Sequence, residues 1–192
     1  MQTTFPRLML KHAAERPSAP ALREKEYGIW QTTPWADLAK LVEAIACGLH
    51  QAGLQRGEHM IIVGSNRPRL SATMLAAQAL GAIPVNLYQD AAAAECVFPI
   101  TNAEVRFCVV EDQEQVDKML EVREQCPQLS HIFYDDPRGL RNYVEDGLGS
   151  LDELIAAGQV FMAQHPQFFH LEVEKGSNDD VAAMFFTSGT TG

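Results

Sequence analysis

The densest group of side chains that could do chemistry lies at the end of the printed sequence. Six consecutive residues there are glycine, serine or threonine: Thr187, Ser188, Gly189, Thr190, Thr191 and Gly192. A mostly apolar run over 180–186 comes directly before them. Glycines let backbone N–H groups approach a ligand and hydroxyls add neutral donors, so the pattern is typical of a loop that wraps oligophosphate. From composition alone, a polar tail is an equally good interpretation.

The spacing of the six residues excludes two other kinds of phosphate loop. A Walker A loop has the pattern GxxxxGK[ST], and this string contains no lysine. The GxGxxG pattern of dinucleotide-binding loops occurs nowhere in the chain. The candidate phosphate-binding residues therefore belong to neither of these classes.

The rest of the sequence offers no candidate catalytic residue and no candidate metal ligand. The cysteines show no CxxC spacing, and none of the six histidines forms an HxxxH or HExxH pair. His50, Cys47 and the pair Glu111 and Asp112 are interpreted as surface or packing residues. All cysteines are interpreted as reduced core thiols: Cys47, Cys96, Cys108 and Cys126.

Hydrophobic periodicity predicts an α/β fold with a mainly parallel sheet flanked by helices, because strands and helices alternate along the chain. We expect a helix over 5–14, a hairpin with strands over 20–23 and 29–32, and later strands over 59–63, 83–87, 105–110, 131–134 and 180–186. Helices are expected from residue 33 to Gly53, in the run that ends at Gly81, and over 92–100, 113–123 and 151–163.

Three local signals refine these boundaries. Thr33 directly precedes Pro34, and Asn66 precedes a helix with Pro68 in its first turn, so both are predicted N-caps. Gly53 is predicted to end its helix in the left-handed conformation. The segment 135–150, rich in Asp, Arg, Gly and Asn, is predicted to be a surface excursion within one domain.

Composition narrows the classes of partner. The chain has 192 residues, 46% of them hydrophobic, and a formal net charge of -10. No apolar run is long enough to span a membrane, and the first twenty residues lack the layout of a secretory signal, so we expect a cytoplasmic location. The negative charge and the lack of a basic patch argue against nucleic acid as a partner.

The string 184–192, read MFFTSGTTG, resembles the signature of the adenylate-forming superfamily, in which three apolar positions lead into TSGTTG. Further segments are similar to acyl-CoA synthetases in the family's order: TPWADL from Thr33, GLQRGE from Gly53, SNRP from Ser65 and GAIPVNLY from Gly81. The resemblance covers essentially the whole chain. It departs from many members at 89–95, where four alanines replace a proline-containing turn, and a bacterial long-chain fatty-acid–CoA ligase type is more similar.

The resemblance implies an enzyme that uses ATP, Mg²⁺ and CoA. A carboxylate would attack the α-phosphate of ATP, pyrophosphate would leave, and the acyl group would pass to the CoA thiol. Thr187, Ser188, Gly189, Thr190, Thr191 and Gly192 would contact the β- and γ-phosphates. The family's magnesium-binding glutamate, ribose-binding aspartate and catalytic lysine correspond to segments beyond residue 192.

Residues 1–192 are thus expected to be the N-terminal part of the large AMP-binding domain, without the C-terminal lid domain, and to be inactive alone. We also expect this piece to associate with itself through an unpaired strand edge. The acid is left open, because the family builds its acid pocket mainly after the phosphate loop. Two alternatives also stay open: a stand-alone nucleotide-binding module, and an amino-acid-activating domain of a peptide synthetase.

Overall fold

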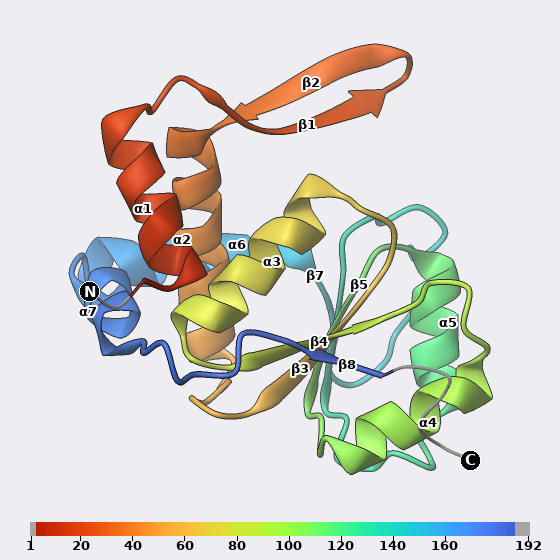
Figure 1. Ribbon diagram of the computed structural model, residues 1–192. Coiled ribbons are helices and arrows are strands. Elements are labelled where there is room, and N and C mark those ends of the chain that lie inside the picture. The colour runs from red at the N-terminus through yellow and green to blue at the C-terminus, as the bar shows by residue number, and fades with distance from the viewer. Residues whose placement is uncertain (1–2, 187–192) are drawn as a thin grey trace.

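A six-stranded parallel sheet forms the centre of the computed structural model, which describes residues 3–186 (Figure 1). Its strands lie in the order β7-β6-β5-β3-β4-β8, and every neighbouring pair is parallel. The bounds are β3 His59–Val63, β4 Ile83–Leu87, β5 Phe107–Val110, β6 His131–Tyr134, β7 Leu148–Ser150 and β8 Met184–Phe185. The predicted fold class is confirmed.

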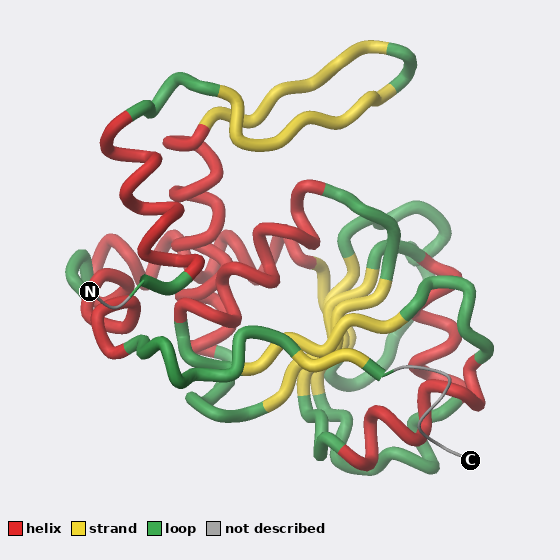
Figure 2. Tube along the Cα trace, viewed as in Figure 1, coloured by secondary structure: helices red, strands yellow, loops and turns green. Residues whose placement is uncertain are grey.

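Helices cover both faces of the sheet, and Figure 2 shows the two helical layers in red on either side of the strands. One layer contains α1 Phe5–Glu15, α2 Trp35–Gln51, α3 Pro68–Ala79, α6 Leu151–Gln164 and α7 Phe168–Lys175. The other contains α4 Ala93–Asn102 and α5 Gln113–Glu121. Within residues 3–186, no helix combines the length and the apolar character needed to cross a bilayer.

Two hydrophobic cores lie on the two faces of the sheet. Met60 and Ile62 of β3 pack in the core under α2 and α3, whereas Ile61 and Val63 pack in the core under α4 and α5. Successive side chains of a strand point to opposite faces, so a strand buried on both faces must be apolar throughout. This is why the run from Met60 to Val63 reads as continuous hydrophobic sequence.

An antiparallel hairpin of β1 Pro20–Glu26 and β2 Ile29–Pro34 projects from the helical layer (Figure 1). Its two-residue turn consists of Tyr27 and Gly28, both in the left-handed region with φ of 46° and 83°. Positive φ at both central residues matches the right-handed twist of a tight hairpin. The predicted hairpin is confirmed, with longer strands.

The two predicted N-caps are wrong, although Gly53 does end α2 in the left-handed region with φ of 99°. Thr33 stays in β2, where it pairs with Leu22, and Pro34 occupies the N-cap position of α2. Asn66 lies one residue too early, because Pro68 opens α3 and the N-cap is Arg67. In both cases the proline marks the helix start better than the polar residue does.

The second half of the chain holds two elements that the sequence pattern missed. The segment predicted as a surface excursion ends in the edge strand β7, which pairs with β6. Helix α7 follows α6 after a short turn. The strand expected over 180–186 is limited to Met184–Phe185.

A capping box begins α6, and we expect its removal to lower the stability of the protein. Ser150 Oγ accepts a hydrogen bond from the N–H of Glu153 at 3.1 Å, and the Glu153 carboxylate accepts from the N–H of Ser150 at 2.9 Å. We expect Ser150→Ala to lower the free energy of unfolding by about 1 kcal/mol, measured by urea unfolding. Ser150→Thr keeps the hydroxyl and should restore most of the loss. Equal losses in the two variants would contradict the capping role.

Candidate functional site at the carboxyl edge of the sheet

The predicted phosphate-binding residues lie outside the described part of the chain. They are Thr187, Ser188, Gly189, Thr190, Thr191 and Gly192, whereas the description ends at Phe186. The structure therefore describes the strand that leads to them and the sheet edge beside that strand.

Strand β8 joins the sheet next to β4 and runs parallel to it. Met184 pairs with Val85 and Phe185 with Asn86. The ring of Phe186 then meets the ring of Phe98 on α4 edge to face, with centroids 5.8 Å apart. Since all strands point the same way, residue 187 follows a strand that ends at the carboxyl edge of the sheet, where α/β folds bind ligands.

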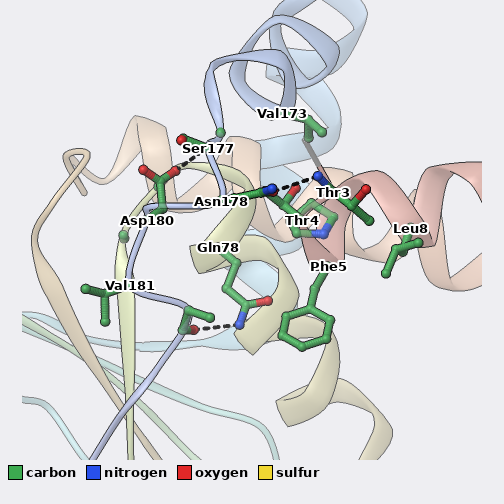
Figure 3. Close-up of a pocket in the computed structure, with 15 residues that line it drawn as sticks. Thr3, Thr4, Phe5, Leu8, Gln78, Val173, Ser177, Asn178, Asp180 and Val181 are labelled. Atoms are coloured by element: carbon green, nitrogen blue, oxygen red, sulfur yellow. Dashed lines mark hydrogen bonds between the residues drawn. The ribbon is translucent and has the colours of Figure 1, made fainter. Parts of the chain in front are cut away.

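Hydrogen bonds with α3 and with Thr3, which precedes α1, hold the segment that precedes β8 (Figure 3). Gln78 Nε2 on α3 donates to the carbonyl of Ala182 at 2.6 Å, and the N–H of Thr3 donates to Asn178 Oδ1 at 2.7 Å. Asp180 accepts from the N–H of Ser177 at 2.9 Å. A pocket of about 150 Å³ lies between this segment and the start of α1. The segment 177–182, which leads into β8, is therefore held by contacts with the helical layer that contains α1 and α3.

The order of the strands creates a crevice at the end of β3. The chain passes from β3 to β4 on one side and then returns to β5 on the other side. Crossover helices leave in opposite directions at such a switch point, and the loops after the two strands separate. Here the segment from Gly64 to Arg67 follows β3, and Glu111 follows β5.

Glu111 ties the two sides of this crevice together. Its carboxylate accepts hydrogen bonds from the N–H of Ser65 at 2.6 Å, from Ser65 Oγ at 2.7 Å and from Arg67 Nε at 2.8 Å. Burial by itself would raise the pKa of Glu111, but the hydrogen bonds from Arg67 and Ser65 outweigh it and hold that pKa below its ordinary value. The ionised Glu111 carboxylate therefore connects β5 to the loop after β3 through these hydrogen bonds.

Further ion pairs surround a cleft of about 580 Å³ between the hairpin and the sheet edge. Arg67 also reaches Glu24 of β1, with 3.6 Å between the charged atoms. Arg69 pairs with Asp135 at 3.0 Å and with Asp152 at 2.6 Å. These arginines are shared between carboxylates, so they hold the hairpin, β6 and α6 around the end of β3.

The pKa of Asp135, the residue after β6, is shifted in the opposite direction to that of Glu111. Burial raises its pKa, the Arg69 guanidinium lowers it in part, and the neighbouring carboxylates of Asp152, Glu111 and Asp136 raise it further. The sequence analysis did not single out Asp135 or the arginines. Their positions in the sequence could have identified them, because each lies directly after a predicted strand or at the start of the helix that follows it.

Three other residues that the sequence analysis interpreted as surface or packing residues, Asp112, His50 and Cys47, have structural roles. Asp112 caps α5 by accepting from the N–H of Gln115 at 3.3 Å, and the ring of His50 lies 4.4 Å from the ring of Phe168. All four cysteines are buried and unpaired. Burial, with a smaller contribution from Glu43, raises the pKa of Cys47 to about 12, so its thiol stays protonated. Among residues 3–186, no group of three His, Cys, Asp or Glu side chains could hold a metal ion.

Comparison with known proteins gives a consistent picture. The family model described as "AMP-binding enzyme" matches residues 9–192. The long-chain-fatty-acid–CoA ligase FadD15 of Mycobacterium bovis is 23% identical over 185 residues, which are 96% of this chain and 29% of that protein. The human long-chain-fatty-acid–CoA ligase ACSBG2 is 26% identical over 175 residues, covering 90% of this chain and 25% of that protein.

Solved structures share the fold. The anthranilate CoA ligase AuaEII, in complex with anthranoyl-AMP, superposes with a TM-score of 0.81 at 18% identity over all of this chain and 33% of its own. Acetoacetyl-CoA synthetase from Streptomyces lividans gives a TM-score of 0.71 at 22% identity, covering 81% of this chain and 25% of its own. The chain thus spans less than a third of the length of the curated relatives described above.

Proposed function

The chain belongs to the AMP-binding enzyme family, and from this premise we propose that it is the N-terminal part of the large domain of an ATP-dependent acid–CoA ligase. The observation that carries the proposal is the position of the TSGTTG string. It follows a strand whose carboxyl end lies at the same sheet edge as the crevice between β3 and β5. Ligands of parallel α/β sheets bind at this edge.

In the proposed reaction, the carboxylate of the acid attacks the α-phosphate of ATP and displaces pyrophosphate. The acyl group then moves from the adenylate to the sulfur of CoA, and AMP leaves. Catalysis of such a step is mainly a matter of positioning and of stabilising charge on the phosphates. We assign hydrogen-bond donor roles to the hydroxyls of Ser188, Thr190 and Thr191 and a phosphate contact to Thr187. Gly189 and Gly192 would allow the turn of the loop around the phosphates.

The family resemblance also implies Mg²⁺. Among residues 3–186, no group of three His, Cys, Asp or Glu side chains could hold it, and Glu111 and Asp135 at the crevice are paired with arginines. We therefore assign no magnesium ligand to residues 3–186 and derive no step through the ion.

The acid that we propose is a fatty acid or a similarly apolar carboxylic acid. The support is that the curated relatives described above carry the name long-chain-fatty-acid–CoA ligase, at 23% and 26% identity. Residues 1–192 alone should not catalyse acid-dependent pyrophosphate exchange, whereas the protein that extends into the family's later segments should. Trapping acyl-adenylates of that protein with hydroxylamine, across fatty, aromatic and amino acids, tests the assignment. A hydroxamate formed only from amino acids would favour the peptide-synthetase alternative.

Loss of single hydroxyls tests the phosphate loop in the same protein. We expect Ser188→Ala, Thr190→Val or Thr191→Val to lower kcat/KM for ATP by roughly tenfold or more, because each removes a hydrogen bond to a charged phosphate, worth about 1.4 kcal/mol. Thr101→Val is the control, since its hydroxyl donates within α4, to the carbonyl of Val97 at 2.7 Å. If none of the three variants differs from this control, the assignment of the loop is wrong.

A further inference from the structure

The distal part of the hairpin β1–β2 has few contacts with the rest of the protein. It consists of residues 23–32 and projects from the helical layer in Figure 1. Every residue of β2 from Ile29 to Thr32 is exposed. An isolated two-stranded hairpin is at best marginally stable in water. The position of this part therefore depends on the base of the hairpin and on contacts across the cleft.

The base of the hairpin is anchored, and a bulge lies within it. Ala21 and Leu22 of β1 pack against the core under α2 and α3, and the N–H of Trp35 donates to the carbonyl of Ala19 at 3.1 Å. Between Pro20 and Leu22 the register with β2 shifts, as at a β-bulge. Bulges bend a strand and interrupt its ladder locally. The ribbon beyond Leu22 can therefore swing about this point while its own ladder stays intact.

One ion pair joins the distal part to the sheet. Among the described residues, Glu24 and Arg67 form the only ion pair or hydrogen bond between residues 23–32 and the rest of the protein, with 3.6 Å between the charged atoms. The Glu24 side chain is 31% exposed and that of Arg67 46%. Ion pairs this exposed are weak, and salt screens them. The distal part is therefore held across the cleft by a contact that is easily broken.

Breaking this pair would leave Arg67 with the sheet. Arg67 Nε lies 2.8 Å from the Glu111 carboxylate, whereas the Glu24 carboxylate lies 3.6 Å from the Arg67 guanidinium. Arg67 would keep its pairing with Glu111, and Glu24 would pass into water with the hairpin. A buried charge that loses its only partner is costly, but neither Glu24 nor Arg67 would become one. The movement is therefore not opposed by a large electrostatic penalty.

We propose that residues 23–32 form a flap over the cleft of about 580 Å³ and that the pair of Glu24 and Arg67 holds this flap closed. Residues 24–27 of the flap line the cleft on one side, and residues 135–138 line it at the sheet edge. The cleft adjoins the crevice at the end of β3, and ligands of parallel sheets bind at such crevices. The flap therefore controls access to the crevice. Its movement needs no catalysis, so it holds or fails independently of the ligase assignment.

The distance between two spin labels tests the flap in the 192-residue chain. One label is attached to Ile29→Cys near the hairpin tip, and the other to Arg141→Cys, an exposed position next to the buried Leu140 in the segment after β6. All four native cysteines are buried, so the two new thiols react selectively. Labelled chain is diluted into unlabelled chain, so that double electron–electron resonance reports distances within one molecule.

Two populations are expected, a closed one at the distance given by the structure and an open one at a longer distance. Raising the ionic strength from about 0.1 M to about 1 M shortens the Debye length from about 10 Å to about 3 Å. The ratio of open to closed molecules should then rise by about twofold, because salt screens the exposed pair. A single distance that salt does not change overturns the proposal.

Neutral variants identify the contact that holds the flap. Glu24→Gln should raise the ratio of open to closed molecules by about threefold at the lower ionic strength, and added salt should then have little further effect. Glu26→Gln is the control and should leave the ratio unchanged, because Glu26 shares the strand and the ribbon face of Glu24 but makes no ion pair among the described residues. An equal shift in the two variants, or an undiminished salt response in Glu24→Gln, overturns the proposal.

Discussion

Gly158→Ala is expected to lower the free energy of unfolding by about 3 kcal/mol or to prevent folding. Gly158 lies in α6 where it crosses α2, and a Cβ atom added there would be 1.9 Å from the carbonyl oxygen of Ala44 and 2.8 Å from the nitrogen of Gly48. Both atoms belong to the backbone of α2, so they cannot move away as the end of a side chain would. The two helices would have to separate, which would disturb the core under them.

Helix propensity opposes this effect and helps to identify it. Alanine in place of glycine inside a helix stabilises that helix by about 1 kcal/mol, so a net loss must come from packing against α2. Gln159→Ala, at the next and exposed position, is the control and should change stability by no more than about 0.5 kcal/mol. Urea unfolding of both variants decides the matter. A Gly158→Ala protein as stable as the control would mean that the helices do not approach this closely.

The central strands of the sheet were among the most predictable elements of the fold, although β5, which is buried at all four residues, begins two residues later than predicted. The bounds predicted for β3, β4 and β6 agree with the structure. Short, mostly apolar runs identify these strands without knowledge of their neighbours, and Gly57 and Gly81, with φ of 85° and 72°, supply the turns before β3 and β4. Local signals were therefore sufficient for the centre of the sheet.

Elements defined by distant partners escaped prediction. Strand β7 has only three residues, Leu148, Gly149 and Ser150, and becomes a strand by pairing with β6. Helix α7 has eight residues, and the ring of its first residue, Phe168, contacts Phe161 at 5.0 Å and His50 at 4.4 Å between centroids. Helices this short have little stability of their own, so tertiary contacts decide their position.

The candidate site divides in the same way. The string 187–192 carries its chemistry in consecutive residues, so the sequence could nominate it. The crevice beside it joins Ser65 to Glu111, which are separated by 46 positions, and Arg67 to Glu24 across the cleft. No spacing rule connects these residues, because only the order of the strands brings them together.

Glu111→Gln is expected to lower the free energy of unfolding by about 2–3 kcal/mol at pH 7. The Glu111 side chain is only 14% exposed, and its carboxylate accepts from Ser65 and Arg67 together. The amide oxygen of glutamine can replace one carboxylate oxygen, but its NH₂ group would then face another donor, and the Arg67 charge would lose its partner. The control is Glu114→Gln on α5, whose side chain is 69% exposed, and it should change stability by no more than about 0.5 kcal/mol.

The pH dependence of the stability lost in Glu111→Gln shows whether the charge of Glu111, and not only its packing, stabilises the protein. The pKa of Glu111 in the folded protein lies below its ordinary value of 4.5, so the folded state favours the carboxylate. The resulting stability is fully present above pH 4.5 and is lost as the pH falls through the folded pKa. Asp135, whose pKa is raised mainly by burial and in smaller part by Glu111, opposes this trend, and Glu111→Gln removes only that smaller part. The difference in unfolding free energy between Glu111→Gln and the unaltered chain should therefore shrink below pH 4.5, and a difference that stays constant into that range would show that the charge of Glu111 does not hold the crevice.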